Sequence, residues 1–114
     1  MLSIEALKEF GCDVETGLAR CVNNEMLFLR LVSTIPGNEN FQKLQSTVRD
    51  QDFENAFQAA HGLKGIVANL SLTPLYEPIN EITEHLRAKE KIDYSNLLET
   101  IEEKRRILQR IVEE

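Results

Sequence analysis

The apolar positions in the C-terminal two-thirds of the chain recur every three or four residues, which is the spacing of one face of an α-helix. The most regular stripe, in residues 53–70, consists of Phe53, Ala56, Ala60, Leu63, Val67 and Leu70. Similar stripes occur in residues 41–48, 74–86 and 94–111. Because the connections between these segments are short, they favour antiparallel neighbours. The pattern predicts an all-α fold in which residues 38–114 form an antiparallel four-helix bundle.

In the segment 1–36, the positions of capping and turn residues predict shorter helices. One ends at Gly11, Asp13 is a suitable N-cap for the next, and Asn24 can cap a third. The third contains the sequence MLFLRLV, which is apolar nearly all round, so we expect it to be buried on several sides. We expect these N-terminal helices to pack over one end of the bundle.

Two prolines fall at the start of the segment 74–86. Thr73 and Pro74 suit the N-cap and the first helical position. Pro78, one turn further on, removes a backbone hydrogen bond from the helix. We therefore expect either a kink or a late start of this helix.

The composition argues against several classes of partner. The 114 residues suit a single domain, residues 1–114. The net charge of −6 argues against nucleic acid and against an anionic membrane surface. No apolar run approaches the roughly 20 residues that cross a bilayer, and the N-terminal segment does not resemble a signal peptide. We expect a cytoplasmic protein. Cys12 and Cys21 have no second pair to complete a zinc site, so we expect two reduced, half-buried thiols and no metal.

One histidine stands beside two glycines in the segment 53–70. Since an α-helix turns by about 100° per residue, His61 lies more than about 100° from the buried face and points toward solvent. Gly65 has no side chain to crowd it, and Lys64 can extend its ammonium toward the imidazole. A glycine inside a helix costs about 1 kcal/mol relative to alanine and usually has a packing or functional reason. We interpret the region as a clearing, that is, an open space on the helix surface beside His61 that admits a bulky, anionic group. The alternative is an incidental surface histidine.

These residues also resemble a known family. The motif His61-x-Leu63-Lys64-Gly65, followed by Ala68-Asn69-Leu70, resembles the signature of histidine-containing phosphotransfer (HPt) domains. Upstream, the residues that match the family's opening pattern are Gly11, Asp13, Gly17, Leu18, Arg20, Asn24 and Leu27. The chain departs from the family at Ser71, where glycine is usual, and at Gly62, where a polar residue is common. The resemblance extends over nearly the whole chain.

The resemblance implies that His61 accepts a phosphoryl group from the aspartate of a receiver domain, or from a partner kinase, and passes it to another receiver. Lys64 would stabilise the phosphoryl charge, and Gly65 would give steric access. The partner-binding residues would be Glu54, Phe57, Gln58, Gly62 and Ala68. The expected partners are receiver domains of response regulators or a hybrid sensor histidine kinase, bound by a monomer.

In the family the metal ion belongs to the receiver, so the resemblance implies no cofactor here. The chain also has no Gly-rich phosphate loop and no acidic cluster placed to hold Mg²⁺ with ATP. We therefore expect a phosphoryl carrier and not a kinase.

Two other functions remain open. The first is an adaptor bundle that binds receiver or kinase domains without being phosphorylated, and the intact motif around His61 argues against it. The second is the phosphotransfer module of a chemotaxis-type kinase, which predicts flanking kinase domains. Because the chain ends in a helix at Glu114 with no linker, we favour a free-standing relay protein.

The second histidine, His85, follows Glu81 by four residues. A di-metal bundle needs a Glu-x-x-His pair on each of two helices, and this spacing occurs nowhere in the chain. We expect His85 to be a solvated surface residue.

Overall fold

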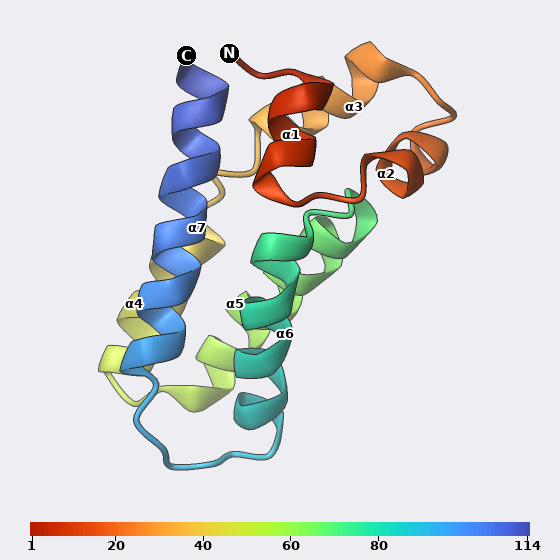
Figure 1. Cartoon of the computed structure of the whole chain (residues 1–114). Helices are drawn as coiled ribbons and strands as arrows, with labels where there is room; N and C mark the ends of the chain where they lie inside the picture. Colours follow the sequence, from red (N-terminus) through yellow and green to blue (C-terminus); the bar gives the residue numbers. More distant parts are fainter.

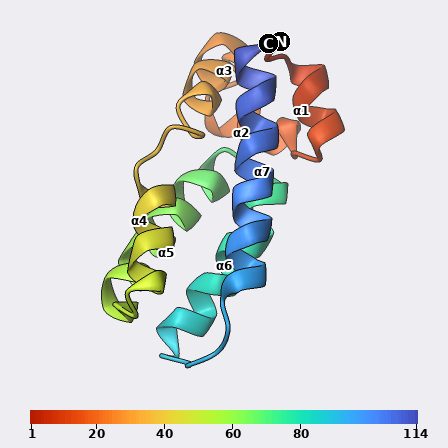
Figure 2. The ribbon, with the colours of Figure 1, turned by 90° about the vertical axis from the view of Figure 1, so that its left-hand side faces the viewer.

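A computed structural model describes all 114 residues as seven helices without a strand (Figure 1). The helices are α1 (Ile4–Phe10), α2 (Val14–Arg20), α3 (Glu25–Ser33), α4 (Asn40–Arg49), α5 (Phe53–Asn69), α6 (Thr73–Arg87) and α7 (Ser95–Glu113). Helices α4 to α7 run alternately in opposite directions, and α1 to α3 lie over the end where α5 turns into α6 (Figures 1 and 2). The prediction of an all-α bundle with additional N-terminal helices is confirmed.

Short polar side chains fix the beginnings of four helices. Ser3, Asp13, Asn24 and Asp52 each accept a hydrogen bond from the backbone N–H three residues further on, at 3.0 to 3.3 Å. Each bond satisfies one of the backbone donors that a helix start leaves without a partner. The caps predicted at Asp13 and Asn24 are therefore present.

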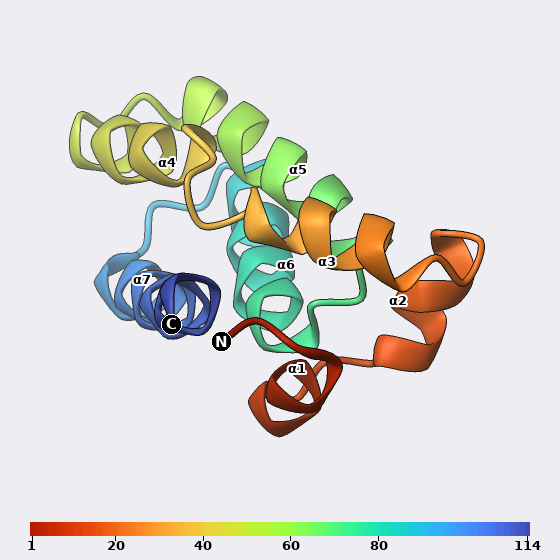
Figure 3. The same ribbon diagram turned by 90° about the horizontal axis from the view of Figure 1, so that it is seen from above.

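Helix α5 lies between α4 and α6 when the molecule is seen from above (Figure 3). From Ala56 to Leu70 its predicted stripe is buried, as is Ala59, which the stripe does not include. Three of these buried residues are alanines, and their small side chains allow neighbouring helices to come close. The buried hydrophobic residues form one cluster to which all seven helices contribute.

Helix α3 is less buried than its composition predicts. Phe28 and Val32 are fully buried, but Met26 is 74% exposed and Leu31 is 37% exposed. The helix lies at the periphery, over the end of the bundle, so only one of its faces meets the core (Figure 3). The prediction of burial on several sides is wrong.

Helix α6 begins at Thr73, one residue before Pro74, and it continues through Pro78. Of the two expected alternatives, a kink or a late start, the late start is not found. Pro78 removes only its own N–H from the helix, and its ring is buried. Leu72 takes the N-cap position that we expected for Thr73, and it forms no side-chain cap.

The turn between α5 and α6 has the hydrogen bonds of a Schellman motif. The N–H of Ser71 donates to the carbonyl of Ala68 at 3.1 Å, and the N–H of Leu72 donates to that of Val67 at 3.0 Å. Ser71 has a φ of +56°, in the left-handed region that such a turn requires at this position. Glycine would adopt this conformation without strain, whereas serine adopts it at a cost.

The N-terminal helices are tied to this turn. The backbone N–H of Asp13 donates to the carbonyl of Ser71 at 3.2 Å, and the guanidinium of Arg20 donates to the carbonyl of Ala68. Gly17 lies so close that a Cβ added to it would be 2.6 Å from Cε1 of Phe28 and 2.8 Å from the carbonyl oxygen of Leu70. The absence of a side chain at Gly17 therefore lets α2 reach the end of α5.

We predict that Gly17→Ala destabilises the protein, because the added methyl group meets a backbone oxygen that cannot rotate away. Overpacking of this kind costs about 1–3 kcal/mol. Urea unfolding should show a lower midpoint with an unchanged slope. Gly37→Ala is the control, since an added Cβ there has nothing within 4 Å. Equal stability of the two variants would contradict the packing role of Gly17.

We predict that Ser71→Gly raises the free energy of unfolding by about 0.5–1 kcal/mol. The left-handed conformation costs an L-residue about 1–2 kcal/mol, and glycine's greater freedom in the unfolded chain offsets part of the gain. The matched control is Ser46→Gly in the interior of α4, which should lower stability by a similar amount. Thermal melts that moved in the same direction for both variants would refute the explanation from backbone conformation.

Candidate functional site

One side of α5 is left uncovered by α4 and α6. We call it the α5 strip, and it consists of the exposed residues Glu54, Gln58, His61, Gly65 and Asn69. The half-buried residues along its edges are Phe57, Gly62, Lys64 and Ala68. The structure therefore brings all eight residues of the predicted site to one side of α5.

His61 is exposed, as predicted, and its ring stacks on that of Phe57 one turn earlier. The ring centroids are 5.6 Å apart and the ring planes differ by 20°. No side chain or backbone group of the chain hydrogen-bonds to either ring nitrogen of His61. The ring therefore rests against Phe57, and both nitrogens remain available to a group that approaches from solvent.

Gly65 opens the space on the next turn of the strip. An added Cβ there would have nothing within 4 Å, so the clearing predicted beside His61 is present. Gly65 also lines a shallow hollow with Leu31 and Thr34, which belong to α3 and the residue after it. The N-terminal helices therefore form one wall of the surface that a partner would meet at Gly65.

Gly62 faces α4 and not the open side. A Cβ added to it would lie 3.0 Å from Nδ2 of Asn40, the first residue of α4. The only close neighbour of a side chain at Gly62 would therefore be Asn40, a contact that the resemblance to HPt domains did not indicate. Because the atom it would meet is the end of a flexible side chain, alanine could be accommodated by a small movement of Asn40.

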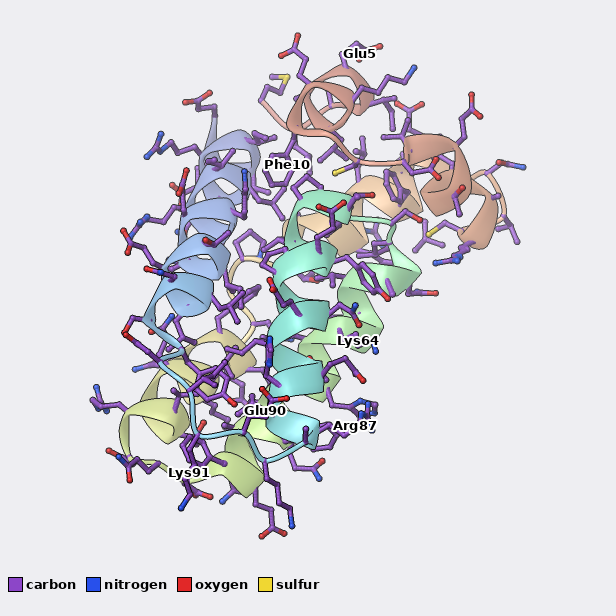
Figure 4. The ribbon with its side chains drawn as sticks, turned by 60° about the horizontal axis from the view of Figure 1, so that its bottom comes forward. Glu5, Phe10, Lys64, Arg87, Glu90 and Lys91 are labelled. Carbon is purple, nitrogen blue, oxygen red and sulfur yellow. The ribbon has the colours of Figure 1, made fainter.

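The ammonium of Lys64, which we expected to be able to reach the imidazole, is paired with a carboxylate of the neighbouring helix. Its Nζ lies 3.6 Å from Oε2 of Glu84 on α6, and Nε of Arg87 lies 3.4 Å from the same oxygen. The guanidinium carbon of Arg87 is 4.9 Å from the ring centroid of Phe57, a distance typical of a cation–π interaction. Figure 4 shows Lys64 and Arg87 on the same side of the molecule. In this structure the ammonium of Lys64 is therefore paired with the carboxylate of Glu84.

Sequence patterns did not indicate Glu84 or Arg87 as site residues. Both lie on the polar side of α6, away from the stripe of Leu75, Ile79, Ile82 and Leu86. A hydrophobic pattern shows which face of a helix is buried, but it does not show which polar residue stands opposite a given residue of the neighbouring helix. The angle between α5 and α6 decides that, and only the structure contains it.

A second hollow lies on the α6 side of Phe57. It is lined by Phe53, Glu54, Phe57, Leu86, Arg87, Lys89 and Lys91. Three of these residues are cations, although the whole chain has a net charge of −6. The surface beside the α5 strip is therefore locally suited to anionic groups.

His85 differs from His61 in its surroundings. Its Nδ1 lies 2.8 Å from Oε2 of Glu90, and its side chain is only partly exposed. His85 lies at the surface, as expected, but its ring is also paired, because the chain after α6 folds back and brings the carboxylate of Glu90 to it. One ring nitrogen of His85 is occupied within the protein.

Both cysteines are free and buried, more deeply than the half-buried state we expected. Burial raises the pKa of the Cys12 thiol to about 12. Since the thiolate is the form that binds metals and attacks electrophiles, this thiol is inert near neutral pH. No helix of the protein combines the length and apolar character that a membrane span requires.

Comparison with protein families gave a match to the Hpt domain over residues 37–114. This range covers α4 to α7 and includes His61, Lys64 and Gly65, whereas the N-terminal residues that resemble the family's opening pattern lie outside it. Comparisons with curated proteins and with solved structures gave no match. The family match spans most of the chain, and the bundle and the exposed histidine of α5 agree with it. The chain therefore belongs to the Hpt domain family, whose members carry phosphoryl groups in two-component signalling.

Proposed function

We propose that this protein is a phosphorelay intermediate in which His61 carries the phosphoryl group. The observation that carries the proposal is the exposed imidazole of His61, which has no hydrogen-bond partner in the chain and stands beside the open space at Gly65. An imidazole is largely neutral near neutral pH and is then a nucleophile. The family match supports the class of reaction.

The donor is the aspartyl phosphate of a receiver domain. One ring nitrogen of His61 attacks the phosphorus atom and forms a P–N bond. The P–O bond to the aspartate breaks, and its electron pair stays on the carboxylate. The other ring nitrogen releases its proton to solvent, which leaves a neutral ring that bears the phosphoryl group. Transfer to a second receiver reverses these steps.

Charge stabilisation comes from cations at the edge of the α5 strip. The transferred phosphoryl group spreads negative charge over three oxygens, so catalysis depends mainly on positioning and on nearby positive charge. Lys64 is three residues from His61 and therefore a neighbour of it on the helix surface. We propose that its ammonium turns toward the phosphoryl group once that group is bound.

We propose that the receiver docks on the α5 strip and its edges. Glu54 and Gln58 would contact it on one side of His61, and Gly65 and Ala68 on the other. Phe57 would contribute apolar area at the edge of the strip that faces α6. Gly62 would contribute at the opposite edge, which faces α4. The protein would act in the cytoplasm as a monomer, since one copy holds every residue of the site.

We predict that His61 is the only phosphorylated residue. With a radiolabelled phospho-receiver as donor, His61→Gln should abolish labelling because no other free imidazole stands in a clearing. His85→Gln is the matched control and should be labelled like the wild type. The label should be acid-labile and stable in base, as phosphohistidine is. Label that survives the His61→Gln change would refute the assignment.

We predict that Gly65→Leu lowers the rate of transfer from the phospho-receiver by roughly 10²-fold, because a bulky side chain displaces the reacting groups from in-line distance. Leucine is the better helix former, so unfolding should show a gain of about 0.5–1 kcal/mol. Gly65→Ala brings a similar gain in stability with little bulk, and it should transfer nearly as fast as the wild type. Transfer by Gly65→Leu at the wild-type rate would mean that the clearing has no function.

A further inference from the structure

We infer that Glu84 is a positioning residue of this site: it holds Lys64 and Arg87 in ion pairs while His61 is unmodified, and it releases them to the phosphoryl group. The inference rests on the proposed function of His61. Glu84 touches neither His61 nor any reacting atom, so it would act only through the two cations.

The geometry of the three residues suggests this role. A single oxygen, Oε2 of Glu84, lies 3.6 Å from Nζ of Lys64 and 3.4 Å from Nε of Arg87. Lys64 comes from α5, whereas Glu84 and Arg87 come from the last turns of α6. The carboxylate therefore links the edge of the α5 strip to the neighbouring helix, and it keeps two positive charges from repelling each other.

Lys64 is a helix neighbour of His61, and Arg87 reaches the same site through the ring of Phe57. Lys64 follows His61 by three residues and shares its side of α5, where neighbouring Cβ atoms are about 5–6 Å apart. Arg87 lies over the ring of Phe57, and that ring stacks on His61. A rotation of either flexible side chain would bring its charge from Glu84 toward a group bound to the imidazole.

The pairs are weak enough to be exchanged. The side chains of Glu84 and Arg87 are 52% and 51% exposed, and that of Lys64 is 26% exposed. Exposed ion pairs change an equilibrium by about fivefold at most. A phosphoryl group offers close to two negative charges and three acceptor oxygens, where the carboxylate offers one charge. Phosphorylation of His61 should therefore draw both cations away from Glu84.

This competition would make the phosphoryl group easier to pass on. If Lys64 and Arg87 were free, they would stabilise phosphorylated His61 without losing their ion pairs with Glu84. Because Glu84 takes them back when the group leaves, the phosphorylated and unmodified states lie closer in free energy. A carrier that must both accept and donate the group benefits from such a balance.

The test uses phosphoramidate, a small donor that needs no protein partner. Its P–N bond breaks as the P–N bond to His61 forms, and ammonia is released. We predict that Glu84→Gln is phosphorylated about two- to fivefold faster than the wild type, because Lys64 and Arg87 are already free. The control is Glu81→Gln, which removes the same charge from an exposed position of α6 that forms no ion pair, and it should react like the wild type.

A role through the cations also predicts the behaviour of combined variants. In a background of Lys64→Ala and Arg87→Ala, the further change Glu84→Gln should leave the rate unchanged. An effect of Glu84→Gln that persisted in this background, or a rate equal to the wild type in the single variant, would overturn the role of Glu84 alone. Wild-type protein that acquires no label on His61 would instead refute the proposed function, and this role with it.

Discussion

Helix α5 packs against α4 on one side and α6 on the other, and this double contact determines which part of its surface remains for chemistry. A helix of period 3.6 can bury a wide stripe and still leave a narrow one exposed. Here the stripe from Ala56 to Leu70 enters the core, so His61 can only lie on the remaining side. The two edges of that side are set by different neighbours, Asn40 at Gly62 and Glu84 at Lys64.

The glycines of the chain lack side chains for different physical reasons. Gly17 allows close contact between α2 and the end of α5, whereas a Cβ at Gly62 would meet only the flexible end of Asn40. A Cβ added at Gly65 would meet nothing within 4 Å, so packing does not explain why a helix accepts its unfavourable propensity there. At Ser71 the situation is reversed, because the backbone adopts a conformation typical of glycine and the residue is serine. At these positions the free-energy cost of a residue depends on its packing and its backbone conformation as well as on its helix propensity.

The sequence predicted those features that depend on local pattern. The buried stripes, the caps at Asp13 and Asn24, and the exposure of His61 all follow from spacing along one helix, which a linear pattern contains. The predictions from the sequence failed where a residue's environment depends on a second helix. The exposure of Met26 depends on how much of α3 the bundle end can cover, and the pairing of Lys64 with Glu84 depends on the angle between two helices. The spacing of hydrophobic residues along the chain determines neither the covered part of α3 nor the angle between two helices.

Near His61, the contacts that hold the backbone are stronger than the ion pairs that hold the charged side chains. This difference would suit a phosphoryl carrier. The backbone around the site is fixed firmly, because hydrogen bonds from Asp13 and Arg20 tie the end of α5 to the N-terminal helices and the buried stripe holds its length. The charges are fixed loosely, because they rest on exposed ion pairs that contribute little to stability. In the proposed function, a firmly held helix would keep the geometry of transfer constant, while the weakly paired cations would follow the phosphoryl charge as it arrives and leaves. If strong buried pairs held Lys64, each transfer would have to break them, and the cost would appear in the barrier.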